Sequence, residues 1–370
     1  MPAEAEPSAL SGSVTLALDA MGGDAAPQMV LAGANIARVR FPALKFLIFG
    51  DEAAIAPRLA SLPGLAEAVT VRHTSAVVTA DAKPSLALRR RDTSMRLAID
   101  AVKAGEAAGA VSAGNTGALM GLAMLVLGTI TGIRRPAIVS YFPTRRGGEA
   151  AMLDLGANAT CDAETLLQFA LMGEVFVRTL LNIPHPTVGL LNIGSEAAKG
   201  PEVLRQAAAQ IKVSALGARF HGFVEGDDIA AGTVDVVVTD GFTGNVALKT
   251  AEGTAKMMTG FLDDAFKSSP LAMLGYLLAR RSLAKLKLRT DPRRYNGAML
   301  IGLNGIVVKS HGGTDALGFA SAIGAAHDLA RYRFNDRIAA EVAALAGPSG
   351  PQAPHLPQAH KAASGGAPGR

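Results

Sequence analysis

The chain has 370 residues, of which 49% are hydrophobic and 18% charged, with one cysteine and no tryptophan. This composition excludes a mostly disordered chain and an internal disulfide. The net charge of +5 favours an acidic partner, whereas the 5% of aromatic residues and the lack of a reading motif argue against nucleic acid.

Short apolar runs alternate with helical stretches from the start of the chain. Residues 14–19 and 44–50 are predicted as strands, and residues near 28–40 and 52–60 as helices. This alternation indicates βαβ units, so we expect an α/β fold with a mainly parallel sheet and helices on both faces. Further strands are predicted at 68–73, 108–114, 137–142, 150–156, 187–194 and 234–241.

Two terminal segments stand apart from this pattern. Residues 1–12 and 346–370 are rich in proline and small residues and are predicted to be disordered. Residues 13–345 are predicted to form a single α/β catalytic unit, with two lobes as an alternative. The chain start lacks a secretory signal, and polar residues and glycines interrupt the uncharged stretch 107–133. We therefore expect a cytoplasmic protein without a membrane span.

The segment 268–289 is apolar at first and carries five Lys or Arg residues in its second half. This pattern predicts a basic amphipathic helix or a helical hairpin. Two interpretations stay open for it: a core or dimer helix with a solvated basic end, or an element that lies on a membrane surface.

Ligands of open α/β sheets bind beyond the carboxyl ends of the strands, so the loops that follow the predicted strands are the candidate site. In the first of them, Gly22 and Gly23 allow a tight turn that points N–H groups at an anion. Asp19 and Asp24 flank these glycines and would repel phosphate unless they bind its protons, a hydroxyl or a neighbouring lysine. A purely structural turn is the alternative.

Two more loops carry polar groups at the start of a predicted helix. Asn115, Thr116 and Gly117 follow the strand at 108–114, where they would contact a ligand or cap the helix. Asp240 precedes a helix predicted to start near residue 243. On that helix Asn245 and Lys249 lie four residues apart and share a face, as ligand-binding groups or as a surface pair.

Three supporting loops end in small and polar residues. They contribute Asn158, the pair Glu196 and Lys199, and the pair His311 and Gly312 as candidate site residues. No His, Cys and carboxylate spacing is typical of zinc, so we expect neither a metal nor a cofactor. Cys161 starts a predicted helix, but packing is favoured over a covalent role because the chain has no nucleophile elbow.

Seven sequence blocks spread over residues 13–340 resemble the acyl-ACP:phosphate acyltransferase family. In chain order they read LALDAMGGDAAP, SAGNTGALM, IRRPAIVSYFPT, LDLGANATCDAE, LLNIGSEAAKG, VVTDGFTGNVALK and SHGGTDALGF. The family pattern has consecutive acidic residues where this chain reads Gly194-Ser195-Glu196-Ala197. This departure leaves Glu196 and Lys199 as the residues to carry over from that block.

The resemblance implies a fold similar to isocitrate/isopropylmalate dehydrogenases and phosphotransacetylases. It also implies that the chain converts fatty acyl-ACP and inorganic phosphate to acyl phosphate and ACP for phospholipid synthesis. A homodimer, loose contact with the anionic inner face of the membrane, and delivery of acyl phosphate to a membrane glycerol-3-phosphate acyltransferase are implied as well. Basic clusters at 89–91, 134–135 and 293–294 would dock the acidic carrier protein.

Phosphate is already an oxyanion at neutral pH, so its attack on a thioester needs positioning and carbonyl polarisation rather than a protein nucleophile. We expect Lys249 or Lys199 to hold phosphate, and Asn245 and Asn115 to orient phosphate or the thioester oxygen. The proton for the departing thiol is assigned to His311 or Asp240.

Three other functions fit parts of the same pattern. An acyl-CoA-dependent phosphotransacetylase would share the phosphate loops. An NAD-dependent dehydrogenase is disfavoured because the glycine fingerprint is missing. A non-catalytic scaffold would bind the acyl carrier without turnover.

Overall fold

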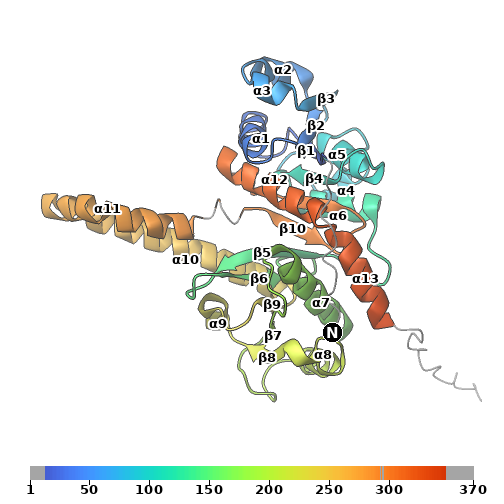
Figure 1. Cartoon of the computed structure of the whole chain (residues 1–370), viewed down its shortest axis with the longest axis vertical. Helices are drawn as coiled ribbons and strands as arrows, with labels where there is room; N and C mark the ends of the chain where they lie inside the picture. Colours follow the sequence, from blue (N-terminus) through green and yellow to red (C-terminus); the bar gives the residue numbers. More distant parts are fainter. Residues whose placement is uncertain (1–12, 292, 294–295, 347–370) are drawn as a thin grey trace, which may run out of the picture.

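The structure is a computed structural model that describes residues 13–291, 293 and 296–346. The predicted disordered termini lie outside the described residues, apart from Ala346, which ends the last helix. Between them the chain folds around one sheet with helices packed on it (Figure 1).

The sheet has 11 strands in the order β3-β2-β1-β4-β11-β10-β5-β6-β9-β7-β8. All the strands predicted from the sequence are present, each within a few residues of its expected bounds. The strands are β1 (Thr15–Asp19), β2 (Lys45–Gly50), β3 (Val69–His73), β4 (Gly109–Ser112), β5 (Ala137–Pro143), β6 (Glu149–Leu153), β7 (Val188–Leu191), β8 (Phe220–Val224), β9 (Val236–Val238), β10 (Ala298–Ile301) and β11 (Ile306–Lys309).

Two parallel blocks make up most of the sheet. Strands β3, β2, β1, β4 and β11 pair in parallel, and so do β6, β9, β7 and β8. Between the blocks, β10 is antiparallel to both β11 and β5, and β5 is antiparallel to β6. The three reversals make the two blocks run in opposite directions. The predicted mainly parallel sheet is therefore confirmed, with an antiparallel centre that the sequence pattern did not reveal.

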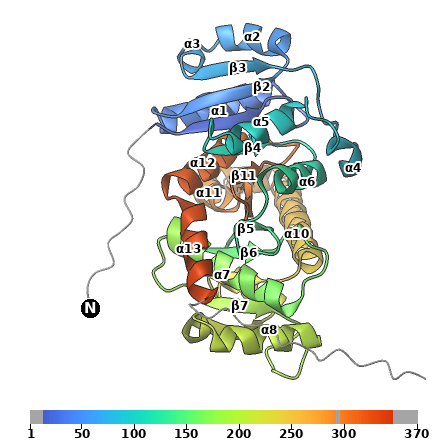
Figure 2. The ribbon, with the colours of Figure 1, turned by 90° about the vertical axis from the view of Figure 1, so that its right-hand side faces the viewer.

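Helices cover both faces of the sheet, as predicted (Figure 2). They are α1 (Gln28–Arg40), α2 (Glu52–Ala60), α3 (Pro63–Ala66), α4 (Pro84–Ala87), α5 (Ser94–Lys103), α6 (Thr116–Leu127), α7 (Ala163–Leu180), α8 (Glu202–Val213), η1 (Gly217–Arg219), α9 (Gly226–Ala231), α10 (Gly241–Lys267), α11 (Pro270–Thr290), α12 (Ala316–Arg331) and α13 (Phe334–Ala346).

Successive side chains of β1 belong alternately to two hydrophobic cores, one on each face of the sheet. Leu16 and Leu18 lie in a hydrophobic cluster with side chains of α1 and α12, whereas Ala17 lies in a second cluster with side chains of α5 and α6. Successive side chains of a strand point to opposite faces. Since all three side chains are fully buried, the strand is sandwiched between helices.

Helices α10 and α11 form a long hairpin that projects from the body of the protein (Figure 1). The helix expected at 268–289 is α11, and its partner is α10, so the hairpin is larger than the sequence predicted. Ser269 caps α11 by accepting a hydrogen bond from the Ala272 N–H at 3.1 Å. Phe266 and Tyr276 contact each other across the bend, with ring centroids 5.3 Å apart.

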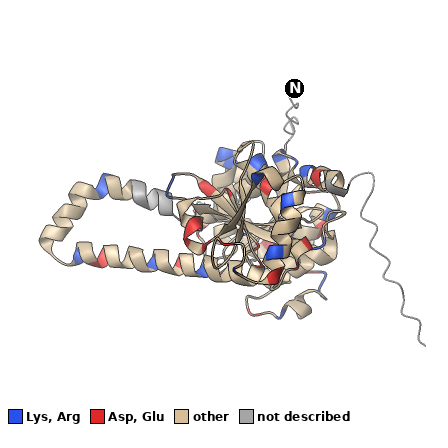
Figure 3. Cartoon of the chain, turned by 90° about the horizontal axis from the view of Figure 1, so that it is seen from below, with Lys and Arg blue, Asp and Glu red and all other residues tan. Residues whose placement is uncertain are grey.

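Many large apolar side chains are exposed on the hairpin, and charged residues are spread between them (Figure 3). Arg280 and Arg281 are exposed on it, whereas the side chains of Lys285, Lys287 and Arg289 lie outside the described residues. None of the helices in the described ranges is long and apolar enough to cross a membrane. The exposed large apolar side chains of the hairpin are Phe242, Val246, Met257, Met258, Phe261, Leu262, Leu271, Met273, Leu274, Tyr276, Leu277 and Leu278.

Candidate active site

Three loops at the carboxyl ends of β1, β4 and β11 lie against one another. The strands are neighbours in the sheet and run in the same direction, so their ends meet at one edge. The Asp24 N–H donates to the Gly312 carbonyl at 3.0 Å, and the Ser310 N–H donates to the Ser112 carbonyl at 2.9 Å. Predicted site residues from three separate sequence blocks are thereby brought together.

The loop after β1 leaves no room for side chains at its glycines. A Cβ on Gly22 would lie 2.7 Å from the Gly114 nitrogen and 2.6 Å from the Asp19 Oδ2. Gly23 has a φ of +103°, which side-chain-bearing residues rarely adopt. The backbone of this loop therefore packs directly on the loop after β4.

Asp19 ends β1 in a buried position. Its Oδ1 accepts a hydrogen bond from the Ser94 hydroxyl and its Oδ2 one from the Ser112 hydroxyl, both at 2.6 Å. Burial raises the pKa of this carboxyl, and the hydrogen bonds from Ser112, Ser94 and the backbone oppose that rise. The Asp19 side chain is thus held by hydrogen bonds inside the protein, whereas Asp24 is exposed at the end of the loop.

In the loop after β4, both the oxygen and the nitrogen of the Asn115 side-chain amide form hydrogen bonds within the chain. Its Oδ1 accepts from the Ala118 N–H at 2.9 Å and caps α6, and its Nδ2 donates to the Ala80 carbonyl at 2.8 Å. Thr116 is exposed on the first turn of α6. Gly117 faces Pro84, whose Cγ would lie 3.0 Å from an added Cβ. Of the two roles predicted for Asn115, helix capping is the one observed.

The loop after β11 adds a cation, Lys309, that was not predicted from the sequence as a site residue. Lys309 is half-buried, and its Nζ donates to the Ala113 carbonyl at 3.4 Å and also to the Ser310 carbonyl. Burial lowers the pKa of Lys309 to about 8, and Lys249 lowers it further, while Asp19 and Asp24 raise it. The available signal was a lysine that ends the apolar strand Ile-Val-Val-Lys just before a glycine loop.

His311 is exposed, and its backbone is held from the segment that returns from the hairpin. Its N–H donates to the Asn296 Oδ1 at 3.0 Å. The Asn296 Nδ2 in turn donates to the Ser310 Oγ at 2.8 Å and to the Thr314 Oγ1 at 3.1 Å. The Gly313 N–H donates to the His311 Nδ1 at 3.2 Å, so a neutral imidazole in this position carries its proton on Nε2.

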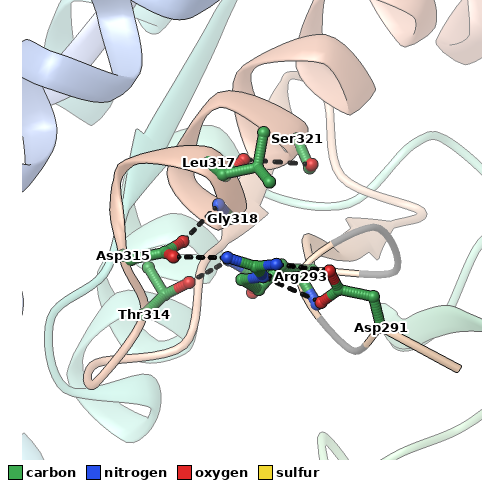
Figure 4. Close-up of polar contacts among 8 residues, drawn as sticks. Asp291, Arg293, Thr314, Asp315, Leu317, Gly318 and Ser321 are labelled. Carbon is green, nitrogen blue, oxygen red and sulfur yellow. Dashed lines mark hydrogen bonds and ion pairs between the residues drawn. The ribbon is translucent and has the colours of Figure 1, made fainter. Parts of the chain in front are cut away.

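Beside this loop, Arg293 bridges two carboxylates (Figure 4). Its Nη2 lies 2.6 Å from the Asp291 Oδ2, and its Nη1 lies 3.0 Å from the Asp315 Oδ2. Asp315 also caps α12 by accepting from the Gly318 N–H at 3.0 Å. These hydrogen bonds raise the pKa of Arg293. Arg293, predicted to dock a carrier, therefore has its charge compensated within the chain, and Arg294 lies outside the described residues.

The second block of the sheet contributes the amino-terminal part of α10. Asp240 caps this helix by accepting from the Thr243 N–H at 2.8 Å. Asn245 lies over Gly156, where an added Cβ would come within 3.2 Å of its amide nitrogen. The exposed Lys249 pairs with Glu252 at 2.8 Å. The charge of Lys249 also lowers the pKa of Lys309 in the loop after β11.

Asn158 is buried and links the loop after β6 to α10. Its Nδ2 donates to the Pro136 carbonyl at 2.8 Å and to the Asp154 Oδ2 at 2.9 Å. Its carbonyl accepts from the Gly241 N–H at 2.7 Å. Asn158 therefore positions the start of α10 through contacts within the chain.

Glu196 and Lys199 form an exposed ion pair in the loop after β7, with the Lys199 Nζ 2.9 Å from the Glu196 Oε1. This pairing lowers the pKa of Glu196 and raises that of Lys199. Neither side chain bonds to Asp240, Lys249 or His311 in the described part of the chain. Within that part there is also no group of three or more His, Cys, Asp or Glu that could hold a metal ion.

Solved structures with a similar fold include a phosphotransacetylase from Streptococcus pyogenes. It is 17% identical with a TM-score of 0.57, over 86% of this chain and 94% of the solved one. A 4-hydroxythreonine-4-phosphate dehydrogenase from Klebsiella pneumoniae is 15% identical with a TM-score of 0.51, over 88% of this chain and 100% of the solved one. At this identity the likeness concerns the fold alone.

Relatives by sequence are much closer. A phosphate acyltransferase from Rhodospirillum centenum is 63% identical over 337 residues, which cover 91% of this chain and 95% of the relative. One from Rhodospirillum rubrum is 59% identical over 335 residues, or 90% of this chain and 96% of the relative. Residues 14–337 also match the family described as "Fatty acid synthesis protein". The chain therefore belongs to this family, and it is an enzyme of the phosphate acyltransferase group.

Proposed function

We propose that the site catalyses attack of inorganic phosphate on the thioester of fatty acyl-ACP. A phosphate oxygen bonds to the carbonyl carbon, the carbon–sulfur bond breaks, and the departing thiolate of ACP takes up a proton. The products are acyl phosphate and ACP. The observation that carries this proposal is the meeting of glycine loops next to Lys309, since backbone N–H groups and cations bind phosphate.

The side-chain contacts guide the choice between candidate residues. Lys249 is our choice for holding phosphate because its charge acts on Lys309 in the loop after β11, and Lys199 is the alternative. Asn245 is our choice for orienting phosphate or the thioester oxygen because the Asn115 amide is occupied. His311 is preferred over Asp240 as the proton donor, because Asp240 caps α10.

The function is tested by incubating purified protein with long-chain acyl-ACP, with and without phosphate, while following free ACP thiol and acyl phosphate. Phosphate-dependent formation of both supports the proposal. Turnover with acyl-CoA alone would instead indicate a phosphotransacetylase, and binding of acyl-ACP without turnover would indicate a scaffold.

Alanine at Lys249 is expected to raise the KM for phosphate roughly 10- to 100-fold, because a charged hydrogen bond worth about 1.5–3 kcal/mol is lost. Lys256, exposed two turns further along α10, provides a matched control in K256A. Steady-state kinetics at varied phosphate measure both variants. Equal KM values for K249A and wild type would mean that Lys249 does not hold phosphate, and Lys199 would become the candidate.

Cys161 is expected to be dispensable. Burial, followed by the charges of Asp154 and Asp240, raises the pKa of its thiol to about 12, so the nucleophilic thiolate is scarce at neutral pH. C161A should keep turnover within about twofold of wild type. A folded C161A enzyme without phosphate-dependent turnover would show that the thiol takes part in the reaction.

We further propose that an acidic ACP docks on exposed arginines of the basic clusters. Arg89, Arg91 and Arg135 are exposed and form no ion pair in the described chain, whereas Arg90 pairs with Asp92 at 3.0 Å. Arg134 is likewise paired, with its Nη1 2.7 Å from the Asp162 Oδ2. Opposite charges steer such a partner, so turnover in the ACP assay should fall as salt is added.

The proposal also includes a homodimer and contact of the α10–α11 hairpin with an anionic membrane surface. A double variant L277E/L278E on the hairpin is expected to reduce cosedimentation with vesicles of anionic lipid about tenfold, because it removes apolar area and adds negative charge. V39E, at an exposed valine on α1, is the control. Light scattering reports the dimer separately, and unchanged vesicle binding of a dimeric L277E/L278E would rule out the hairpin as the contact.

A further inference from the structure

The loop after β1 poses an electrostatic problem for a phosphate site. Asp24 is exposed at its end, and its Oδ2 lies 3.3 Å from the position that a Cβ on Gly313 would take. Asp19 lies at its start, below Gly22. Two carboxylates next to the backbone N–H groups would repel a phosphate that carries one to two negative charges. Something must offset them if this edge of the sheet binds phosphate.

Lys309 lies where its ammonium group can offset the negative charges of these two carboxylates. It ends β11, adjacent to Ser112 of β4 in the sheet register, and its Nζ is fixed by the carbonyls of Ala113 and Ser310. The charged side chains that act on it are Asp19, Asp24 and Lys249. Burial and Lys249 both disfavour the ammonium form, so the two carboxylates are the groups that keep Lys309 charged.

We propose that Lys309 is a positioning residue for phosphate, which acts by neutralising Asp19 and Asp24 rather than by touching the ligand. The carbonyls of Ala113 and Ser310 hold its ammonium at the strand ends, beneath the glycine loops. With the lysine in place the loops present their N–H groups without a net negative charge. This inference rests on the proposed function, because it assumes that phosphate binds at these loops.

Asp24 is the better carboxylate for a test. Its side chain is exposed and makes no hydrogen bond within the described residues, so Asp24→Asn changes charge with little change in packing. Asp19 is unsuitable because it accepts hydrogen bonds from Ser94 and Ser112. If Lys309 acts through the carboxylates, removal of the Asp24 charge must offset removal of the lysine charge.

The experiment compares the KM for phosphate, with acyl-ACP as the second substrate, in wild type, K309M, D24N and K309M/D24N. We expect K309M to raise this KM about tenfold or more, and K309M/D24N to recover at least about threefold of that loss. D24N by itself should not raise the KM. K309R, which keeps the charge, should stay close to wild type, and K45M at an exposed lysine of β2 is the matched control.

Two results would overturn the inference: an unchanged KM in K309M, or a raised KM that D24N does not lower. The second result would mean that Lys309 contacts phosphate directly or has a merely structural role. If K309M does not fold, K309Q takes its place in the same comparison. The rise in Tm on adding phosphate alone is measured for every variant, so the inference can be judged separately from acyl transfer. Wild type that gains Tm with phosphate but does not turn over acyl-ACP would refute the proposed function only.

Discussion

Replacement of Asp154 by alanine is expected to lower the free energy of unfolding by about 3–5 kcal/mol. The carboxylate is fully buried. It accepts hydrogen bonds from the backbone N–H groups of Ile138, Gly156, Ala157 and Asn158 and from the Asn158 side chain, at 2.7–3.2 Å. The substitution leaves these donors without an acceptor in a place that water does not reach, and each such donor costs about 1–3 kcal/mol.

Urea denaturation of D154A and wild type measures this loss. D51A is the matched control, because Asp51 is also a carboxylate that accepts a backbone N–H, from Ala53 at 3.1 Å, but lies at the surface as the cap of α2. We expect D51A to cost about 1 kcal/mol. Equal losses for the two variants would mean that the loop after β6 does not depend on the buried carboxylate.

Alanine at Gly244 is expected to reduce both stability and turnover. A Cβ at this position would lie 1.9 Å from the Asp154 carbonyl oxygen, a backbone atom that cannot rotate away. Helix α10 must therefore shift, and overpacking of this kind costs about 1–3 kcal/mol or more. Gly244 immediately precedes Asn245, so the shift also moves the proposed ligand-binding face. Turnover should fall about a hundredfold, since a displacement of 1 Å is enough for such an effect.

Gly253 on the same helix is the matched control, because nothing lies within 4 Å of a Cβ built there. G253A should stabilise the protein by about 0.5–1 kcal/mol, as alanine is favoured over glycine in a helix interior. Urea denaturation and the phosphate-dependent assay are run on both variants. A G244A protein that matches G253A in both measurements would show that α10 needs no close approach to the loop after β6.

Both predictions concern the contact that holds the second block of the sheet to the site. Asp154 and Asn158 order the loop after β6, and that loop receives the start of α10. Because α10 carries Asn245 and Lys249, the precision of this contact decides where the proposed phosphate-binding face lies. The hairpin that α10 forms with α11 returns to the site at Asn296, which holds the His311 loop.

The local features of this protein could be predicted from its sequence. Helices α1 and α2 have the bounds expected from apolar periodicity, because a helix of this length is specified by residues a few positions apart. Strands β1, β2 and β3 were found for the same reason. The family could be recognised because its motifs are short contiguous blocks. Most of the residues that surround the site were in these blocks, although Asn296 and Lys309 were not. The location of the site at strand ends followed from the α/β pattern.

The other features depend on contacts between elements that lie far apart in the sequence. Strands β8, β10 and β11 were not predicted. They have only 4 or 5 residues, and although β10 and β11 pair with each other, their other partners, β5 and β4, lie far away in the sequence. The opposite directions of the two blocks follow from those pairings. Capping by Asn115 was one of two roles predicted from the sequence, but the contact of its Nδ2 with Ala80 and the burial of Asn158 were not, since each depends on neighbours from other elements. The place of Lys309 between two carboxylates and Lys249 emerged only when β1, β4, β11 and α10 were assembled, because charge interactions depend on distance in space and not along the chain.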